Sequence, residues 1–328
     1  MKDFSLKKLI FSGAAIVLLL GVIIGGLHIL ESTVFNSETL PESFVSTSSK
    51  TVEKENIKYF PRQDITTILL MGIDSLEEAQ ESEYYVNEGL SDAVAVLIFD
   101  EKNKVINAIA LNRDSMVEMP ILGLGGKFAG TTVAQLALAH TYGSGLNDSC
   151  ENVEWTVSKL LNGYEMDYYI SLNMGAVPAV NDAVGGVKVN VKDDFSAVDP
   201  DIKKGEYVLM GDEALTFVRA RKDLGDQLNV SRMERHKEYV RGFMEAFRTK
   251  SKEDNLFALD LYEAAEGYMV TDCSGDALAS LAERYEDYEM GEIVTPKGEN
   301  IINNGHYEFH IDEEDLENII LEYLYAPK

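Results

Sequence analysis

Apolar and polar positions follow two repeating patterns from residue 64 onward. Short apolar runs at 65–74 and 166–173 and an alternating run at 187–191 predict strands. Residues 91–115 hold two apolar runs joined by a polar turn, which predicts a β-hairpin. Helical spacing of apolar residues predicts helices over 131–143, 151–163, 174–186, 211–218 and 232–250. This mixture predicts an α/β fold in which helices flank a central mixed β-sheet.

The last part of the chain shows helical spacing and little candidate chemistry. Apolar residues recur with the helical period in 256–269 and 313–325. We therefore expect a folded domain at 64–250 and an acidic, helical C-terminal extension at 251–328 that packs on it.

The N-terminal region contains a long apolar segment. Residues 9–30 carry no charged side chain, and as a helix they would span about 33 Å, enough to cross a bilayer. Lysines precede this segment, so residues 1–8 are expected in the cytoplasm and the rest of the chain outside the membrane. A cleaved signal peptide is the alternative, but the segment is long for one and lacks a good small-residue cleavage site. We expect a retained, single-pass anchor in the cell membrane.

Between this segment and the domain, residues 31–63 are rich in Ser, Thr, Glu and Lys and have no sustained periodicity, which predicts a solvated stalk. The whole chain has a formal net charge of -27. Because residues 1–30 carry three lysines and one aspartate, the part outside the membrane would carry -29. So acidic a domain is repelled by nucleic acid, which we exclude as a partner.

Several familiar catalytic motifs are absent. The sequence has no P-loop, no nucleophile elbow of the GxSxG type and no HExxH zinc motif. Its two cysteines, Cys150 and Cys273, would either form a disulfide outside the membrane or remain as two buried thiols. Neither cysteine has a neighbouring Cys or His, so a zinc site is not expected.

Arginines are concentrated in one segment of this acidic chain. Six of the nine arginines lie between Arg219 and Arg248. Arg232 and Arg235 share one face near the start of a predicted helix with His236, and Arg219 and Arg221 are aligned if the backbone there is extended. Surface ion pairs are the alternative, but each contributes only about 0–1 kcal/mol and gives no reason for clustering. The cluster therefore predicts a phosphate or pyrophosphate site.

Acidic and basic residues also stand at the ends of the predicted strands. Asp74 closes the first strand, Asp92 opens the second, and Arg113 follows the third. As a turn residue and a strand cap, Asp74 and Asp92 would have ordinary structural roles. Two carboxylates together with pyrophosphate oxygens would instead supply a Mg²⁺ site, which we favour because arginines are within reach.

Seven segments occur in the order and spacing of one known family. They read ILLMGIDS, SDAVAVLIFD, LNRDS, LAHTYG, VNDAVGGVKVNV, GDEALTFVRAR and GDQLNVSRMERH. On these segments the chain, from about Ile65 to Phe247, resembles the LytR-CpsA-Psr enzymes, which attach glycopolymers to the bacterial cell wall. The resemblance implies an α/β domain with an apolar cavity for a prenyl tail, and a phosphotransferase activity.

The implied reaction moves a polymer from an undecaprenyl-pyrophosphate carrier onto peptidoglycan and releases undecaprenyl phosphate. By motif match, Asp74 and Asp92 would hold Mg²⁺ (or Mn²⁺). The pyrophosphate would be bound by Arg113, Arg219, Arg221, Arg232 and Arg235, with His236 beside them. With Arg113, the expected catalytic residues are Asp92 and Asp226, either of which could take the proton of the attacking sugar hydroxyl.

This chain departs from the family pattern at three positions. Many members have Arg where Leu90 stands, a basic residue in place of Gln135, and Gln in place of His236. Two missing positive charges are compatible with another substrate, with weaker binding of pyrophosphate, or with a role in binding without catalysis. A non-catalytic receptor for polyprenyl (pyro)phosphate and a pyrophosphatase are therefore kept as alternatives. The glycopolymer, whether teichoic acid, capsule or another, stays open.

Overall fold

The structure is a computed structural model. It describes residues 51–82, 87–123, 126–220, 224, 229–254, 257–274, 277, 280, 281, 284, 285, 288–303 and 306–327. For residues 229–233, 248, 258, 259, 262 and 306 the description covers the backbone only. The predicted tail at 1–8, the predicted membrane segment at 9–30 and the first part of the predicted stalk lie outside the described residues. Among the described residues, no helix is both long enough and apolar enough to span a bilayer.

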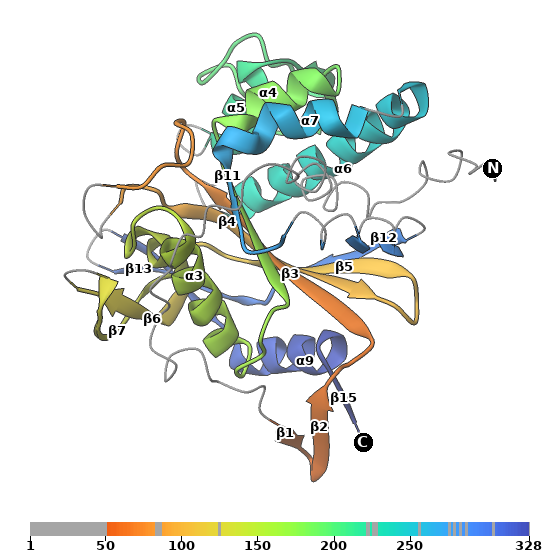
Figure 1. Ribbon diagram of the computed structural model, residues 1–328. Coiled ribbons are helices and arrows are strands. Elements are labelled where there is room, and N and C mark those ends of the chain that lie inside the picture. The colour runs from red at the N-terminus through yellow and green to blue at the C-terminus, as the bar shows by residue number, and fades with distance from the viewer. Residues whose placement is uncertain are drawn as a thin grey trace.

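A mixed sheet forms the centre of the molecule (Figure 1). Among the described residues it has six strands in the order β11-β8-β3-β4-β5-β12. Their bounds are β3 (Ile65–Ile73), β4 (Ser91–Asp100), β5 (Val105–Leu111), β8 (Tyr168–Asn173), β11 (Met269–Thr271) and β12 (Glu289–Val294). The pairs β3/β8 and β5/β12 are parallel, and β3/β4, β4/β5 and β8/β11 are antiparallel. The predicted mixed α/β fold and the 91–115 hairpin are thereby confirmed.

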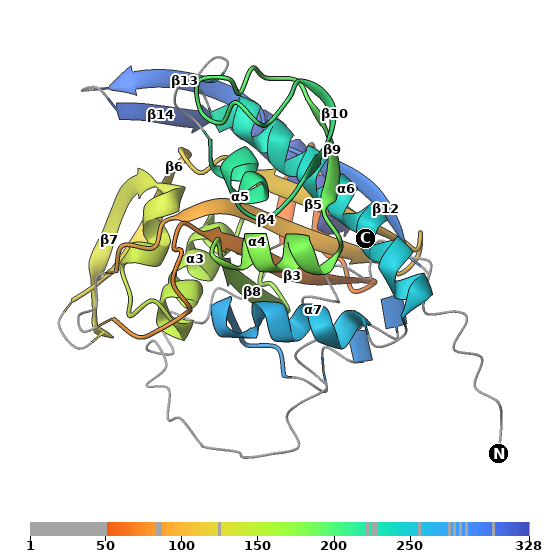
Figure 2. The ribbon, with the colours of Figure 1, turned by 90° about the horizontal axis from the view of Figure 1, so that it is seen from above.

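Helices cover both faces of this sheet (Figures 1 and 2). One face carries η3 (Leu136–Thr141), α3 (Asn147–Leu160) and α9 (Glu313–Tyr323). The other carries α4 (Ala176–Ala183), α5 (Asp212–Arg219), α6 (Asn229–Glu253), α7 (Phe257–Ala265) and the strand pair β9 (Val187–Val191) and β10 (Gly205–Leu209). The sheet strands are buried on both faces because each face has its own apolar layer.

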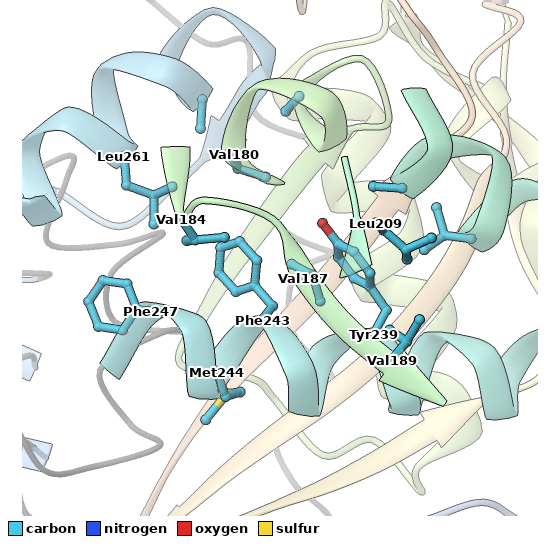
Figure 3. Close-up of a cluster of buried hydrophobic side chains, with 14 of the residues drawn as sticks. Val180, Val184, Val187, Val189, Leu209, Tyr239, Phe243, Met244, Phe247 and Leu261 are labelled. Atoms are coloured by element: carbon cyan, nitrogen blue, oxygen red, sulfur yellow. The ribbon is translucent and has the colours of Figure 1, made fainter. Parts of the chain in front are cut away.

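The second of these layers contains a dense group of apolar side chains, which we name the α4–α7 cluster (Figure 3). Its labelled members are Val180, Val184, Val187, Val189, Leu209, Tyr239, Phe243, Met244, Phe247 and Leu261. Helix α6 lies directly on β9 at Gly242, where an added Cβ would come within 2.1 Å of the Lys188 carbonyl oxygen. The prenyl cavity implied by the family resemblance stays a prediction.

The helix predicted over residues 131–143 is confirmed only in part. Residues 131–143 contain the end of strand β7 (Phe128–Gln135), which pairs with β6 (Met116–Leu122), and only η3 of this stretch is helical. The consecutive β-branched residues Thr131, Thr132 and Val133 favour an extended backbone, which outweighs the apolar spacing that follows.

Among its described residues, the C-terminal extension contains strands as well as helices. Besides α7, η4 (Glu266–Tyr268) and α9, residues 251–328 form five described strands: β11, β12, β13 (Gly298–Asn303), β14 (His306–Ile311) and β15 (Tyr325–Pro327). Strand β11 pairs with β8 and β12 pairs with β5, so the extension supplies both edges of the central sheet. It is therefore part of the domain rather than an addition packed on it.

The end of the predicted stalk also folds. Strands β1 (Val52–Lys54) and β2 (Ile57–Pro61) form a hairpin, and β15 pairs with β2, at the bottom of Figure 1. The two turn residues, Glu55 and Asn56, both have positive φ angles, 52° and 65°, as a tight hairpin requires. Any stalk therefore ends before this hairpin.

The two cysteines lie on opposite sides of the sheet. Cys150 belongs to the apolar layer beneath α3, whereas Cys273 belongs to the layer of the α4–α7 cluster. Both thiols are free and buried, and burial raises the pKa of each, that of Cys273 to about 12. Of the two alternatives left open by the sequence, the structure thus shows two buried thiols.

Helix α3 carries a carboxyl group with an altered acidity. Burial, reinforced by the negative charges of Asp272, Glu151 and Glu165, raises the pKa of Glu154 from 4.5 to about 7. Folding therefore favours the protonated form, and the folded chain keeps this proton at pH values where the unfolded chain has lost it. The contribution to the free energy of unfolding is full below pH 4.5 and falls by about 2–3 kcal/mol as the pH rises through 7.

Glu154→Gln is expected to remove this part of the pH dependence. Urea unfolding at pH 5 and pH 8 should show a smaller loss of stability between the two pH values than in the parent chain. The exposed Glu299 on β13 provides a control, because Glu299→Gln should leave the pH dependence as it is. An unchanged pH dependence in Glu154→Gln would show that Glu154 ionises normally in the folded chain.

Candidate functional site

Three of the predicted site residues meet at one edge of the central sheet. Strands β3, β5 and β8 end at this edge and β4 begins there, since β4 is antiparallel to both β3 and β5. Asp74 follows β3, Asp92 is the second residue of β4, and Arg113 follows β5 by two residues. The Asp74 amide donates to the Leu90 carbonyl at 2.8 Å, which joins the end of β3 to the approach to β4.

Asp92 and Arg113 form an ion pair in a nearly closed environment. Their side chains are 6% and 11% exposed, and the guanidinium Nη1 contacts Asp92 Oδ1. Arg113 Nε lies 3.5 Å from Asp114 Oδ1 but makes no hydrogen bond among the described residues. Arg113 therefore stands between two carboxylates and keeps one buried donor available for a further acceptor.

Gln135, the last residue of β7, contacts Asp114 beside this ion pair. Its Nε2 donates to Asp114 Oδ1 at 3.2 Å and to the Tyr307 carbonyl at 2.6 Å. Tyr307 lies on β14, whose Phe309 amide donates to the Asp114 carbonyl at 2.8 Å. Gln135, a neutral amide, thus ties the site to the C-terminal hairpin.

Sequence reasoning missed the support given by η3. His140 Nδ1 lies 2.8 Å from the Gly89 carbonyl, and Ser91 Oγ donates to the Ala137 carbonyl at 3.3 Å. Burial lowers the pKa of His140 to about 4, so the ring is neutral at pH 7 and its Nδ1 carries the donated proton. The LAHTYG segment had been matched to the family, but nothing local indicated that His140 holds the loop leading to Asp92.

Arg219 reaches the same strand ends from the sheet face that carries α5. It is the last residue of α5, and its Nη2 lies 2.7 Å from Asp74 Oδ1. The two side chains are 39% and 27% exposed, so this pair is more open to solvent than the Asp92–Arg113 pair. Two carboxylate–guanidinium pairs therefore line the end of β3 and β4.

Arg235 and His236 lie on α6 and contact the end of α5. Arg235 is 6% exposed and donates to the Phe217 and Ala220 carbonyls and to Asp193. His236 Nε2 lies 2.9 Å from the Val218 carbonyl. Both side chains thus contact the end of α5 instead of Asp74 or Asp92. The helical spacing put them on one face, as expected, but that face meets another segment of the chain.

The remaining predicted residues give no further geometry. Arg221 and Asp226 lie outside the described residues, and for Arg232 only the backbone position in α6 is described. A groove of about 610 Å³ lies between β6, α3 and α9, and none of the predicted site residues lines it.

The donor set can be tested for a divalent cation. Among the described residues, no group of three or more His, Cys, Asp or Glu side chains could hold a metal ion. Mg²⁺, however, is commonly bound by one or two carboxylates completed by substrate phosphates and water. Asp74 and Asp92 are such a pair, and each carboxylate already contacts a guanidinium group, that of Arg219 or of Arg113. The two aspartates fit Mg²⁺ or Mn²⁺ only together with phosphate oxygens.

Known proteins share this chain's sequence pattern and fold. Residues 34–323 match the LytR_cpsA_psr family. The polyisoprenyl-teichoic acid–peptidoglycan teichoic acid transferase TagU of Enterococcus faecalis is 26% identical over 255 residues, 77% of each chain. The crystal structure of Bacillus subtilis TagV (24% identity, TM-score 0.57) is matched over 80% of this chain and 98% of its own. A structure of TagT bound to LIIa-WTA (23% identity, TM-score 0.59) is matched over 80% and 90%.

Proposed function

Because this chain belongs to the LytR-CpsA-Psr family, we propose that it is a transferase that moves a glycopolymer from a polyprenyl-pyrophosphate carrier onto peptidoglycan. The observation that carries the proposal is the meeting of the Asp92–Arg113 and Asp74–Arg219 pairs at one edge of the sheet. The name of the E. faecalis relative contains the words polyisoprenyl, teichoic acid and peptidoglycan, and so supports the same donor and acceptor. A teichoic acid is accordingly the first polymer to test.

Arg113 and Arg219 would bind the pyrophosphate. Arg113 has a buried Nε that makes no hydrogen bond within the described part of the chain, and Arg219 is exposed enough to turn from Asp74 toward a ligand. Guanidinium groups bind phosphate oxygens in a fixed, bidentate geometry. They would also stabilise the charge that develops on the leaving phosphate.

The proposed reaction forms one bond to phosphorus and breaks another. A sugar hydroxyl of peptidoglycan attacks the phosphorus atom that bears the glycopolymer, and the bond from that phosphorus to the bridging oxygen breaks. Polyprenyl phosphate leaves, and a phosphodiester joins the polymer to the acceptor. The hydroxyl proton passes to a carboxylate, for which we propose Asp92 or Asp226. Asp74 and Asp92 would hold Mg²⁺ or Mn²⁺, which neutralises charge on the pyrophosphate when bound.

The lipid part of the donor would lie along the α4–α7 cluster. Helix α5 carries Arg219 at its end, and Phe217 and Val218, two residues and one residue before it, are buried in the same apolar layer. A ligand with a charged head at Arg219 and an apolar tail would therefore meet apolar side chains at once. The anchor predicted at 9–30 would hold the domain at the outer surface of the cell membrane. The lipid tail of such a donor is embedded in that membrane.

The experiment uses the full chain in detergent with a synthetic lipid-pyrophosphate saccharide bearing a teichoic acid unit, peptidoglycan oligomers, and either Mg²⁺ or EDTA. Mass spectrometry should detect a saccharide–phosphate–peptidoglycan adduct that is lost with EDTA and in Arg219→Gln. Arg241→Gln, on the exposed side of α6, is the control and should retain activity. Bound lipid without adduct would identify a receptor instead, and free saccharide phosphate would identify a pyrophosphatase.

A further inference from the structure

Arg235 is a buried cation whose donors are used within the chain. Its Nε donates to the Phe217 carbonyl at 3.1 Å, its Nη2 donates to the Ala220 carbonyl, and its Nη1 donates to Asp193 Oδ2 at 2.8 Å. The guanidinium also lies 5.9 Å from the ring centre of Phe195. Its charge is therefore balanced by Asp193 and by carbonyl dipoles, without a ligand.

His236 extends the same contact by one residue. Its Nε2 lies 2.9 Å from the Val218 carbonyl, so the proton on this nitrogen is donated to the backbone. Together, Arg235 and His236 engage the carbonyls of residues 217, 218 and 220. These carbonyls lie at the C-terminal end of α5, where the last turn of a helix leaves its acceptors unpaired and where cations are favoured.

Arg219 stands in the middle of this clamped turn. The residues on either side of it, Val218 and Ala220, are the ones whose carbonyls are held from α6. The helix ends directly after Arg219, because Ala220 has an extended backbone with ψ of 129°. From this turn the Arg219 side chain runs toward Asp74, and its Nη2 lies 2.7 Å from Asp74 Oδ1.

We propose that Arg235 and His236 are positioning residues, which clamp the end of α5 so that Arg219 faces Asp74 and the pyrophosphate. The inference deepens the proposed function and rests on it for the identity of the ligand. It assigns the crowded arginines two different tasks: Arg219 contacts the anion, whereas Arg235 never does.

The first measurement is amide hydrogen exchange of the full chain without ligand. Arg235→Gln and His236→Ala should speed exchange over residues 216–220 by about fivefold or more, because the clamped turn opens more often. His236→Gln should restore protection, and Arg241→Gln should change nothing there. Arg235→Lys, which keeps the charge but cannot reach three acceptors, should resemble Arg235→Gln if the chain stays folded. Unchanged exchange in both Arg235 variants would overturn the proposal.

The second measurement is a double-mutant cycle with Arg219, read as the affinity for inorganic pyrophosphate and as the transfer rate. Alone, Arg235→Gln should lower each by about tenfold, because misplacement of a binding group by about 1 Å has effects of this size. In the Arg219→Gln background it should lower them by less than about twofold, since it acts only through Arg219. Full, multiplicative losses would show that Arg235 contacts the anion itself and would overturn the proposal.

The two measurements also separate this inference from the proposed function. If the parent chain neither binds pyrophosphate nor transfers saccharide, the proposed function fails. The hydrogen-exchange result still decides the clamp in that case, because it needs no ligand.

Discussion

Asparagine in place of Asp92 is expected to slow glycopolymer transfer by more than about a hundredfold, the usual effect of removing one preorganised charge from a closed site. Asp92 is 7% exposed and pairs with Arg113, so the change removes the charge that orients this arginine and one of the two proposed metal ligands. Asparagine has nearly the same shape, so the sheet edge should remain intact. The measurement is the initial rate of adduct formation, with circular dichroism as a check on folding.

The same strand offers a matched control. Asp100 is the last residue of β4, is 2% exposed, and pairs with Arg62 at 3.0 Å at the opposite edge of the sheet. Asp100→Asn should lower the unfolding temperature and leave the transfer rate within about twofold of the parent, because a structural pair far from the site affects stability alone. Equal losses of activity in the two variants would place the reaction elsewhere.

Alanine in place of Phe243 is expected to lower the free energy of unfolding by about 3–5 kcal/mol, as large-to-small changes do in tightly packed cores. Phe243 is 7% exposed and lies in the α4–α7 cluster beside Tyr239, with ring centres 6.2 Å apart (Figure 3). Removing the ring leaves a hole that the flanking helices cannot easily close. Urea unfolding of the parent and the variant gives the difference directly.

Phe128→Ala is the control for this change. Phe128 is 40% exposed on β7, so its truncation should alter stability by no more than about 0.5 kcal/mol. A loss of less than about 1 kcal/mol in Phe243→Ala would show that the cluster is loosely packed. That outcome would contradict a filled core in the ligand-free chain and would favour a preformed space for a prenyl tail.

The hydrophobic pattern predicted most of the central sheet and the residues gathered at its edge. Short apolar runs predicted β3, β4 and β5, and once these strands are antiparallel neighbours, Asp74, Asp92 and Arg113 must lie at the same end. The strands of the C-terminal extension were missed, because β11 is three residues long and β13 is exposed along its whole length. Neither has the buried alternation on which a strand prediction depends.

The partners of the basic residues could not be predicted in the same way. Helical spacing correctly set Arg235 and His236 near each other on α6, but it carries no information on what faces them. Asp193 lies 42 positions from Arg235, and the carbonyls of α5 are present whatever the sequence. A cluster of arginines beside a predicted loop therefore fits both an anion site and a backbone clamp, and only the long-range geometry separates the two.

The strand order of the central sheet has a consequence for synthesis of the chain. Its two outermost strands, β11 and β12, come from the last fifth of the sequence, whereas its four inner strands are complete by residue 173. While the ribosome is still adding the residues in between, β8 and β5 have open edges that can pair with other chains. The domain can close its sheet only after residue 294 has emerged, so a protein truncated near residue 250 should aggregate.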